Sequence, residues 1–125
     1  MRFLTHNSLK CLAKEATTGY PLRIEIAEMN VVETECNVEF IKHILPSLIW
    51  PAVLIAAEAI QLEGMPAEFS ADMLNDPDFV LAIHRLLLDV HVVGGVLICP
   101  DTGRRFEIRN GIPNMRYFDI LVVYF

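Results

Sequence analysis

The sequence of 125 residues lacks the glycine patterns by which proteins bind nucleotide cofactors. Its six glycines are scattered, and no three of them have the spacing of a dinucleotide-binding turn or of a phosphate-binding loop. The HExxH pattern of zinc proteases and the GxSxG pattern of serine hydrolases are absent as well. A self-sufficient enzyme of these classes is therefore excluded, and we predict no catalytic residue.

Long apolar runs are also missing. The longest stretch without an acidic, basic or histidine residue runs from Ile44 to Ala57 and is interrupted by Pro46 and Pro51. It is too short for a membrane-spanning helix, which needs roughly 20 residues. Polar residues near the start interrupt the apolar region that a secretory signal requires. We expect an intracellular protein, cytoplasmic and nuclear, with no membrane partner.

Cysteine is scarce, and its arrangement is that of an incomplete metal site. Cys99-Pro-Asp-Thr-Gly103 has the shape of a zinc knuckle, but Thr102 stands where a second thiol would be needed. Cys11 is solitary, and only His6 lies near it in the sequence. Because a structural zinc site needs four good ligands, we predict free thiols and no metal, with Cys11 and Cys99 as remnant positions. A Cys99 nucleophile with His91 as its base is disfavoured, since free cysteines are usually buried.

Charged residues make up 21% of the chain, and their signs are unevenly distributed. The net charge is −6, yet residues 25–84 hold eleven acids and a single base, whereas residues 1–24 and 85–125 are weakly positive. This distribution suggests that the two ends fold together and that the acidic middle is inserted between them.

Apolar residues, in contrast, are abundant. They form 54% of the chain, whose mean hydropathy is +0.41, against roughly 45–50% in typical soluble domains. A core of this size does not need so many apolar side chains. The excess suggests that a partner covers some of them.

Alternating apolar and polar residues predict strands near both ends. Residues 22–26 have the period of a half-buried strand, and residues 31–36 could pair back on it. Residues 90–93 and 96–99 flank Gly94-Gly95, which favours a tight hairpin. A further strand, residues 105–109, ends at the turn signal Asn110-Gly111, so we expect a C-terminal meander.

The middle of the chain predicts helices. Asn37 can cap a helix that continues to Leu45, and Pro51 suits the first turn of a helix over residues 52–62. Asp76-Pro77-Asp78 is the clearest start signal, since it combines a capping acceptor with a first-turn proline. Residues 65–75 are expected to form a loop.

Four arginines lie close together near the C-terminus. They could contact RNA phosphates or an acidic protein, or they could form a solvated strand face. The residues are Arg104, Arg105, Arg109 and Arg116. An independent ribbon-like RNA-binding module is therefore the alternative function that the sequence leaves open.

Residues 99–115, with their Cys-Pro-x-Thr-Gly and Gly-Ile-Pro-Asn motifs, resemble the multifunctional methyltransferase subunit family, the tRNA methyltransferase 112 homologues. The resemblance extends to residues 1–7, Cys11, residues 21–23 and 37–40, Trp50 with the helix after it, and residues 84–88. It implies an α+β fold with a small zinc-ribbon-like antiparallel sheet, residues 1–36 plus 91–125. An acidic helical subdomain, residues 37–90, would be inserted into it.

Members of that family are not enzymes. The resemblance implies a non-catalytic subunit that binds, solubilises and activates S-adenosylmethionine-dependent methyltransferases, which modify tRNA, ribosomal RNA and a translation release factor. The cofactor would then be bound by a catalytic partner with a Rossmann-like fold, in a heterodimer. RNA or the release factor would be reached only through that complex, and this chain would carry no cofactor.

The resemblance also places the partner contact on an edge strand and on apolar residues around Gly-Ile-Pro-Asn. An unpaired strand edge is a template for a partner strand. The apolar tail 117–125 must be covered as well, by this chain's own sheet or by the partner. The predicted partner-binding residues are Phe3, Phe106, Ile108, Asn110, Gly111, Ile112, Pro113, Asn114, Met115, Tyr117 and Phe118.

Overall fold

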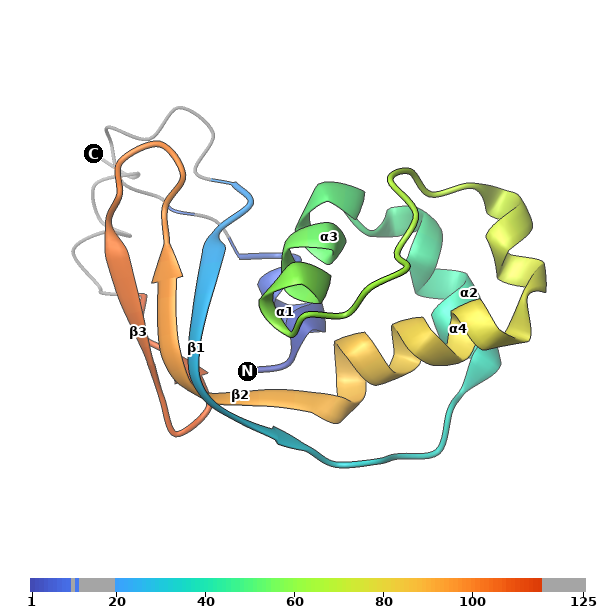
Figure 1. Cartoon of the computed structure of the whole chain (residues 1–125), viewed down its shortest axis with the longest axis horizontal. Coiled ribbons are helices and arrows are strands. Elements are labelled where there is room, and N and C mark those ends of the chain that lie inside the picture. Colours follow the sequence, from blue (N-terminus) through green and yellow to red (C-terminus); the bar gives the residue numbers. More distant parts are fainter. Residues whose placement is uncertain (10, 12–19, 116–125) are drawn as a thin grey trace.

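A computed structural model describes residues 1–9, 11 and 20–115. In these residues an antiparallel sheet lies on one side, helices lie on the other, and the short N-terminal helix lies between them (Figure 1). The α+β class predicted from the sequence is confirmed. The elements are α1 (Phe3–His6), β1 (Arg23–Val31), α2 (Val38–Ile44), α3 (Trp50–Ala59), α4 (Pro77–His84), β2 (Val90–Ile98), β3 (Arg105–Arg109) and β4 (Ile112–Pro113), with 3₁₀ turns at Leu45–Ser47 and Ala71–Asn75 and a π turn at Arg85–Asp89.

The described part of the sheet has the strand order β1-β2-β3-β4, and each neighbouring pair is antiparallel. All three longer helices lie in the sequence between β1 and β2, which are neighbours in space. The N-terminal and C-terminal parts of the chain therefore share one sheet, as the charge distribution suggested. The exact boundaries predicted for the two domains remain a prediction.

The predicted hairpin at Gly94-Gly95 is wrong. Residues 90–98 form one continuous strand, β2, and neither glycine adopts a positive φ. A side chain at Gly95 would overlap the backbone carbonyl of Glu25 on β1, so this glycine allows the two strands to approach closely. The pairing register shifts beside it, between Ile26 and Glu28. Close approach, rather than a turn, explains the glycine pair.

The predicted pairing of residues 31–36 with the first strand is also wrong. β1 continues to Val31, its partner is β2, and the chain then leads to α2 without further strand structure. In contrast, the turn at Asn110-Gly111 is confirmed. The two residues have φ values of 52° and 77°, as the two-residue turn of a tight hairpin requires.

The predicted helix starts are confirmed. The side chain of Asn37 accepts a hydrogen bond of 3.0 Å from the backbone N–H of Phe40, and Asp76 accepts one of 3.0 Å from Asp78. The helix predicted over residues 52–62 ends at Ala59, because Gln61 adopts a left-handed φ of 59°. Part of the predicted loop 65–75 forms the 3₁₀ turn at Ala71–Asn75.

One buried polar cluster joins the segment after β1 to the end of α4. His84 Nε2 lies 3.2 Å from Asp89 Oδ1, and the hydroxyl of Thr34 donates a hydrogen bond of 2.6 Å to the same oxygen. The backbone N–H of Val32 also donates to the Asp89 carbonyl oxygen over 2.9 Å. These bonds hold the connection to α2 against the π turn.

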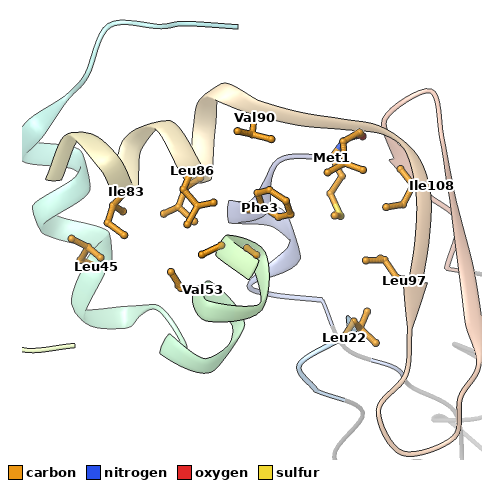
Figure 2. Packing of buried hydrophobic residues seen from close by; sticks show 14 of the residues in the cluster. Met1, Phe3, Leu22, Leu45, Val53, Ile83, Leu86, Val90, Leu97 and Ile108 are labelled. Carbon is orange, nitrogen blue, oxygen red and sulfur yellow. The ribbon is translucent and has the colours of Figure 1, made fainter. Parts of the chain in front are cut away.

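A single apolar core extends from the helices to the sheet (Figure 2). Phe3 of α1 is 1% exposed and lies between Leu86 on the helical side and Leu97 and Ile108 on the sheet. The core therefore crosses the boundary predicted between the sheet domain and the helical subdomain. The two parts are stabilised by the same buried surface.

Among the described residues, no single helix is long and apolar enough to cross a membrane. The helical stretches Val38–Ser47 and Trp50–Ala59 reach the required length and composition only together, across a bend of 116°.

Candidate functional site

The turn between β3 and β4 presents an apolar side chain to solvent. Asn110 and Gly111 reverse the chain, so that Ile112 pairs with Arg109 and Pro113 with Ile108. The backbone N–H of Asn114 donates a further hydrogen bond of 2.7 Å to the Glu107 carbonyl oxygen. Although its backbone is held in this way, the side chain of Ile112 is 67% exposed. A large apolar side chain fixed in water is a candidate contact for a partner.

The N-terminus holds this turn in place. The α-ammonium group of Met1 donates hydrogen bonds to the carbonyl oxygens of Val92, over 2.7 Å, and Gly111, over 2.6 Å. The backbone N–H of Gly111 donates to Val93 over 2.9 Å. Burial, with a smaller contribution from the charge of Arg2, lowers the pKa of the Met1 amine. The position of the turn therefore depends on residue 1 as well as on β2.

A hollow of about 450 Å³ lies beside the turn, where the end of β1, the start of β2 and the turn meet. Its lining includes Asn30, Val32 and His91, none of which was predicted from the sequence to bind a partner. Val32 is 53% exposed and adds a second accessible apolar side chain. The pairing of β1 with β2 brings these residues to the turn, and residue patterns within each segment contain no signal of that pairing.

Three of the predicted partner-binding residues are buried within this chain. Phe3 is 1% exposed, and Phe106 and Ile108 are 3% exposed, because β3 alternates its side chains and turns these two toward the helices. In this structure they pack the core rather than offer surface to a partner. Of the others, Asn110, Ile112 and Asn114 are exposed, Gly111, Pro113 and Met115 are half-buried, and Tyr117 and Phe118 lie outside the described residues.

Arg105 and Arg109 lie on the solvent face of β3, where acids accompany them. Arg105 pairs with Glu25 on β1 over 2.8 Å, and Arg109 pairs with Glu107 over 2.6 Å. Arg104 is half-buried, and Arg116 lies outside the described residues. Two of the predicted phosphate contacts thus have a carboxylate as their immediate neighbour. The structure favours a solvated strand face over an RNA-binding patch.

The remnant of the zinc knuckle keeps its turn. The backbone N–H of Gly103, whose φ is 74°, donates to the Cys99 carbonyl over 3.0 Å, and the backbone N–H of Cys99 donates to Arg104 over 2.9 Å. Burial raises the pKa of the Cys99 thiol. Hydrogen bonds from the Thr102 side chain, the backbone of Thr102 and Asp101, and the Cys11 thiol lower that pKa by more, so the net shift is downward.

The side chains present at this knuckle do not fit a structural zinc ion. In residues 1–9, 11 and 20–115, no three His, Cys, Asp or Glu side chains converge on a point that could hold a metal. His6 is buried, and its Nε2 lies 2.7 Å from the carbonyl oxygen of Leu22. Burial lowers the pKa of His6, and this hydrogen bond partly opposes that effect. Cys11 and Cys99 therefore supply only two of the four ligands that a structural zinc ion needs.

A thiol enzyme built from Cys99 and His91 is also disfavoured by position. His91 lies near the start of β2 and Cys99 directly follows its end, so eight residues of largely extended chain, at most about 26 Å long, separate them. A general base must be within hydrogen-bond reach of its nucleophile. His91 cannot activate this thiol.

Comparisons with known proteins agree over nearly the whole chain. The sequence profile of one family, described as Trm112p-like protein, matches residues 2–111. A multifunctional methyltransferase subunit TRM112 homolog A from Arabidopsis thaliana is 38% identical over 92% of this chain and 94% of its own length. The TRM112-like subunit of Mus musculus is 38% identical over 92% and 93%, and the TRM112 subunit of Saccharomyces cerevisiae is 33% identical over 92% and 95%.

Among solved structures, this chain is similar to a chain of the E. cuniculi Mtq2-Trm112 complex, which is described as responsible for methylation of the eRF1 translation termination factor. The TM-score is 0.64 at 17% sequence identity, and the match covers 94% of this chain and 96% of that chain. At this identity the likeness establishes the fold.

Proposed function

Because this chain belongs to the Trm112p-like protein family, we propose that it is the non-catalytic, activating subunit of an S-adenosylmethionine-dependent methyltransferase heterodimer. The observation that carries the proposal is the extent of the match, which covers residues 2–111 and relatives named as methyltransferase subunits. The sequence itself has no glycine-rich cofactor motif. S-adenosylmethionine is therefore bound by the catalytic subunit, for which we propose a Rossmann-like fold.

The contact surface in this proposal is the β3–β4 turn and the side chains around it. Ile112 supplies an exposed apolar anchor, and Val32 lies at the edge of the neighbouring hollow. Among the described residues β4 pairs only with β3, and we propose that a partner strand covers its outer edge. Apolar anchors beside an open strand edge are typical of partner surfaces.

Activation follows from mass action. A subunit that binds only the folded catalytic chain stabilises that fold by an amount that rises with its concentration relative to the dissociation constant. Covering an apolar face of the catalytic chain also keeps that chain soluble. The substrates we propose are tRNA, ribosomal RNA and a translation release factor, each reached through the complex, in the cytoplasm and the nucleus.

The test is co-expression of this chain with a candidate methyltransferase from the same cells, followed by purification and a methylation assay. We expect a soluble, active 1:1 heterodimer, whereas calorimetry with the isolated chain should give no binding of S-adenosylmethionine. Cofactor binding by the isolated chain would overturn the proposal. RNA binding by the isolated chain with a steep salt dependence would support the alternative module instead.

A matched pair of variants tests the contact surface. Ile112→Asp places a charge on the exposed anchor and should abolish co-purification while the isolated variant stays folded. Ile49→Asp is the control, because Ile49 is also an exposed isoleucine, at 48%, but lies before α3 in the helical part. Equal loss of the complex in both variants would contradict this surface.

A further inference from the structure

Two cysteine thiols that are far apart in the sequence lie together in the core. Cys11 is 3% exposed and Cys99 is 1% exposed, and both belong to the main apolar cluster. Neither is bonded to another cysteine, and their thiol groups hydrogen-bond to each other. Cys36, the third cysteine, is half-buried in the segment that leads to α2.

The turn after β2 is built to hold the sulfur of Cys99. The left-handed φ of Gly103 closes the turn, and its N–H bonds the Cys99 carbonyl oxygen. The hydroxyl and backbone of Thr102 and the backbone of Asp101 form hydrogen bonds to the Cys99 sulfur. N–H and O–H groups directed at a sulfur stabilise a thiolate over a thiol. The turn therefore favours Cys99 as the first of the two sulfurs to react.

No third ligand joins these two sulfurs within the described residues, so a four-coordinate metal does not explain the pair. Two thiols in hydrogen-bond contact can, however, react with each other once one of them is oxidised. One sulfur comes from the N-terminal segment and the other from the knuckle turn that joins β2 to β3. A bond between them would link the two ends of the fold.

We propose that Cys11 and Cys99 are a peroxide-sensitive pair that closes an intramolecular disulfide between the N-terminal segment and the β2–β3 turn. The Cys99 thiolate attacks hydrogen peroxide, the O–O bond breaks, and hydroxide leaves to become water. The resulting sulfenic acid is attacked by the Cys11 sulfur; the S–O bond breaks, the S–S bond forms, and a second water leaves. Overall, two thiols and one peroxide give one disulfide and two waters.

Burial selects the oxidant in this proposal. The two side chains are almost inaccessible, so a bulky disulfide such as oxidised glutathione cannot reach them without local opening. Hydrogen peroxide is a much smaller molecule, only slightly larger than water. The product closes a loop of about 90 residues, and cross-links over long loops restrict the unfolded chain the most. The oxidised protein should therefore be more stable to heat than the reduced protein.

The experiment uses the reduced full-length chain, treated with dilute hydrogen peroxide, alkylated and digested with trypsin. The three cysteines fall in different tryptic peptides, residues 11–14, 24–42 and 86–104, so the cross-link is identified directly. We expect peptide 11–14 joined to peptide 86–104, an intact mass lower by two hydrogens, and a melting temperature that rises by several degrees and reverts on reduction.

Cys11→Ser and Cys99→Ser should each abolish the cross-link and the stabilisation, whereas the control Cys36→Ser should retain both. If a serine variant fails to fold, peptide mapping of the peroxide-treated native chain still tests the proposal. Four outcomes would overturn the proposal: a cross-link through Cys36, dimers joined by disulfides, sulfinic acid at Cys99 without a cross-link, or no loss of thiols from the folded chain.

Discussion

The α-ammonium group of Met1 lies 2.6 Å from the carbonyl oxygen of Gly111, a residue 110 positions further along the chain. This bond fixes the turn that carries Ile112 to the very start of the protein. A charged donor to a partly buried carbonyl is among the stronger hydrogen bonds of a fold. The partner surface that we propose is therefore sensitive to changes at the N-terminus.

An extension placed before Met1 should destabilise the protein. Extra residues convert the ammonium group to an amide with one N–H, which cannot donate to both Val92 and Gly111. We expect a loss of about 2 kcal/mol in the free energy of unfolding, measured by urea denaturation. Proteolytic removal of the extension directly before Met1 should restore stability. An extended chain as stable as the free one would contradict this role.

Gly95→Ala should destabilise the sheet, because the new methyl group would overlap the Glu25 carbonyl. Separating β1 from β2 to make room costs about 1–3 kcal/mol. Gly94→Ala is the matched control. A methyl group there would have no neighbour nearer than 3.9 Å, and alanine has a smaller conformational entropy cost in a strand. The melting temperatures of the two variants should therefore differ. That of Gly95→Ala should fall, whereas that of Gly94→Ala should stay unchanged or rise slightly.

Phe3→Ala should cost about 3–5 kcal/mol, since it empties the centre of the core between helices and sheet. Ile112→Ala removes an exposed side chain and should change the free energy of unfolding by less than about 0.5 kcal/mol. Denaturant titration checks both. Equal losses would show that Ile112 belongs to the core and not to an accessible surface.

Stability should fall as the pH falls below the ordinary pKa of histidine, about 6.5. Burial lowers the pKa of His6 in the folded state, so between the two pKa values the unfolded chain binds the extra proton. His6→Gln keeps an N–H donor for Leu22 but does not titrate. Between pH 7.5 and 5.5 the melting temperature of the native chain should fall by more than that of His6→Gln. If the melting temperatures of both proteins fell equally with pH, His6 would not contribute to the pH dependence of stability.

Local signals were enough to predict where helices begin and where one turn lies. Asn37, Asp76 and Asn110-Gly111 each act on neighbouring backbone groups, so their effects can be recognised within a few residues. The α+β class followed from the same patterns and from the family resemblance.

Pairing between distant segments could not be predicted in this way. Gly94-Gly95 suits a turn or a close approach of strands equally well, and only the position of Glu25 on β1 decides between them. The same holds for the site: Val32 and His91 reach the turn only because β1 lies beside β2. The family resemblance places Phe106 and Ile108 at the partner contact, which stays a prediction, whereas in this chain the alternation of β3 buries both side chains.

The position of Met1 in the fold also limits when its native contacts can form. The Met1 ammonium group bonds the carbonyl oxygens of Val92 and Gly111, which are 91 and 110 residues further along the chain. Contacts between distant residues slow folding, because a long loop must close before they form. These two hydrogen bonds therefore form only after β2 and the turn between β3 and β4 have been synthesised.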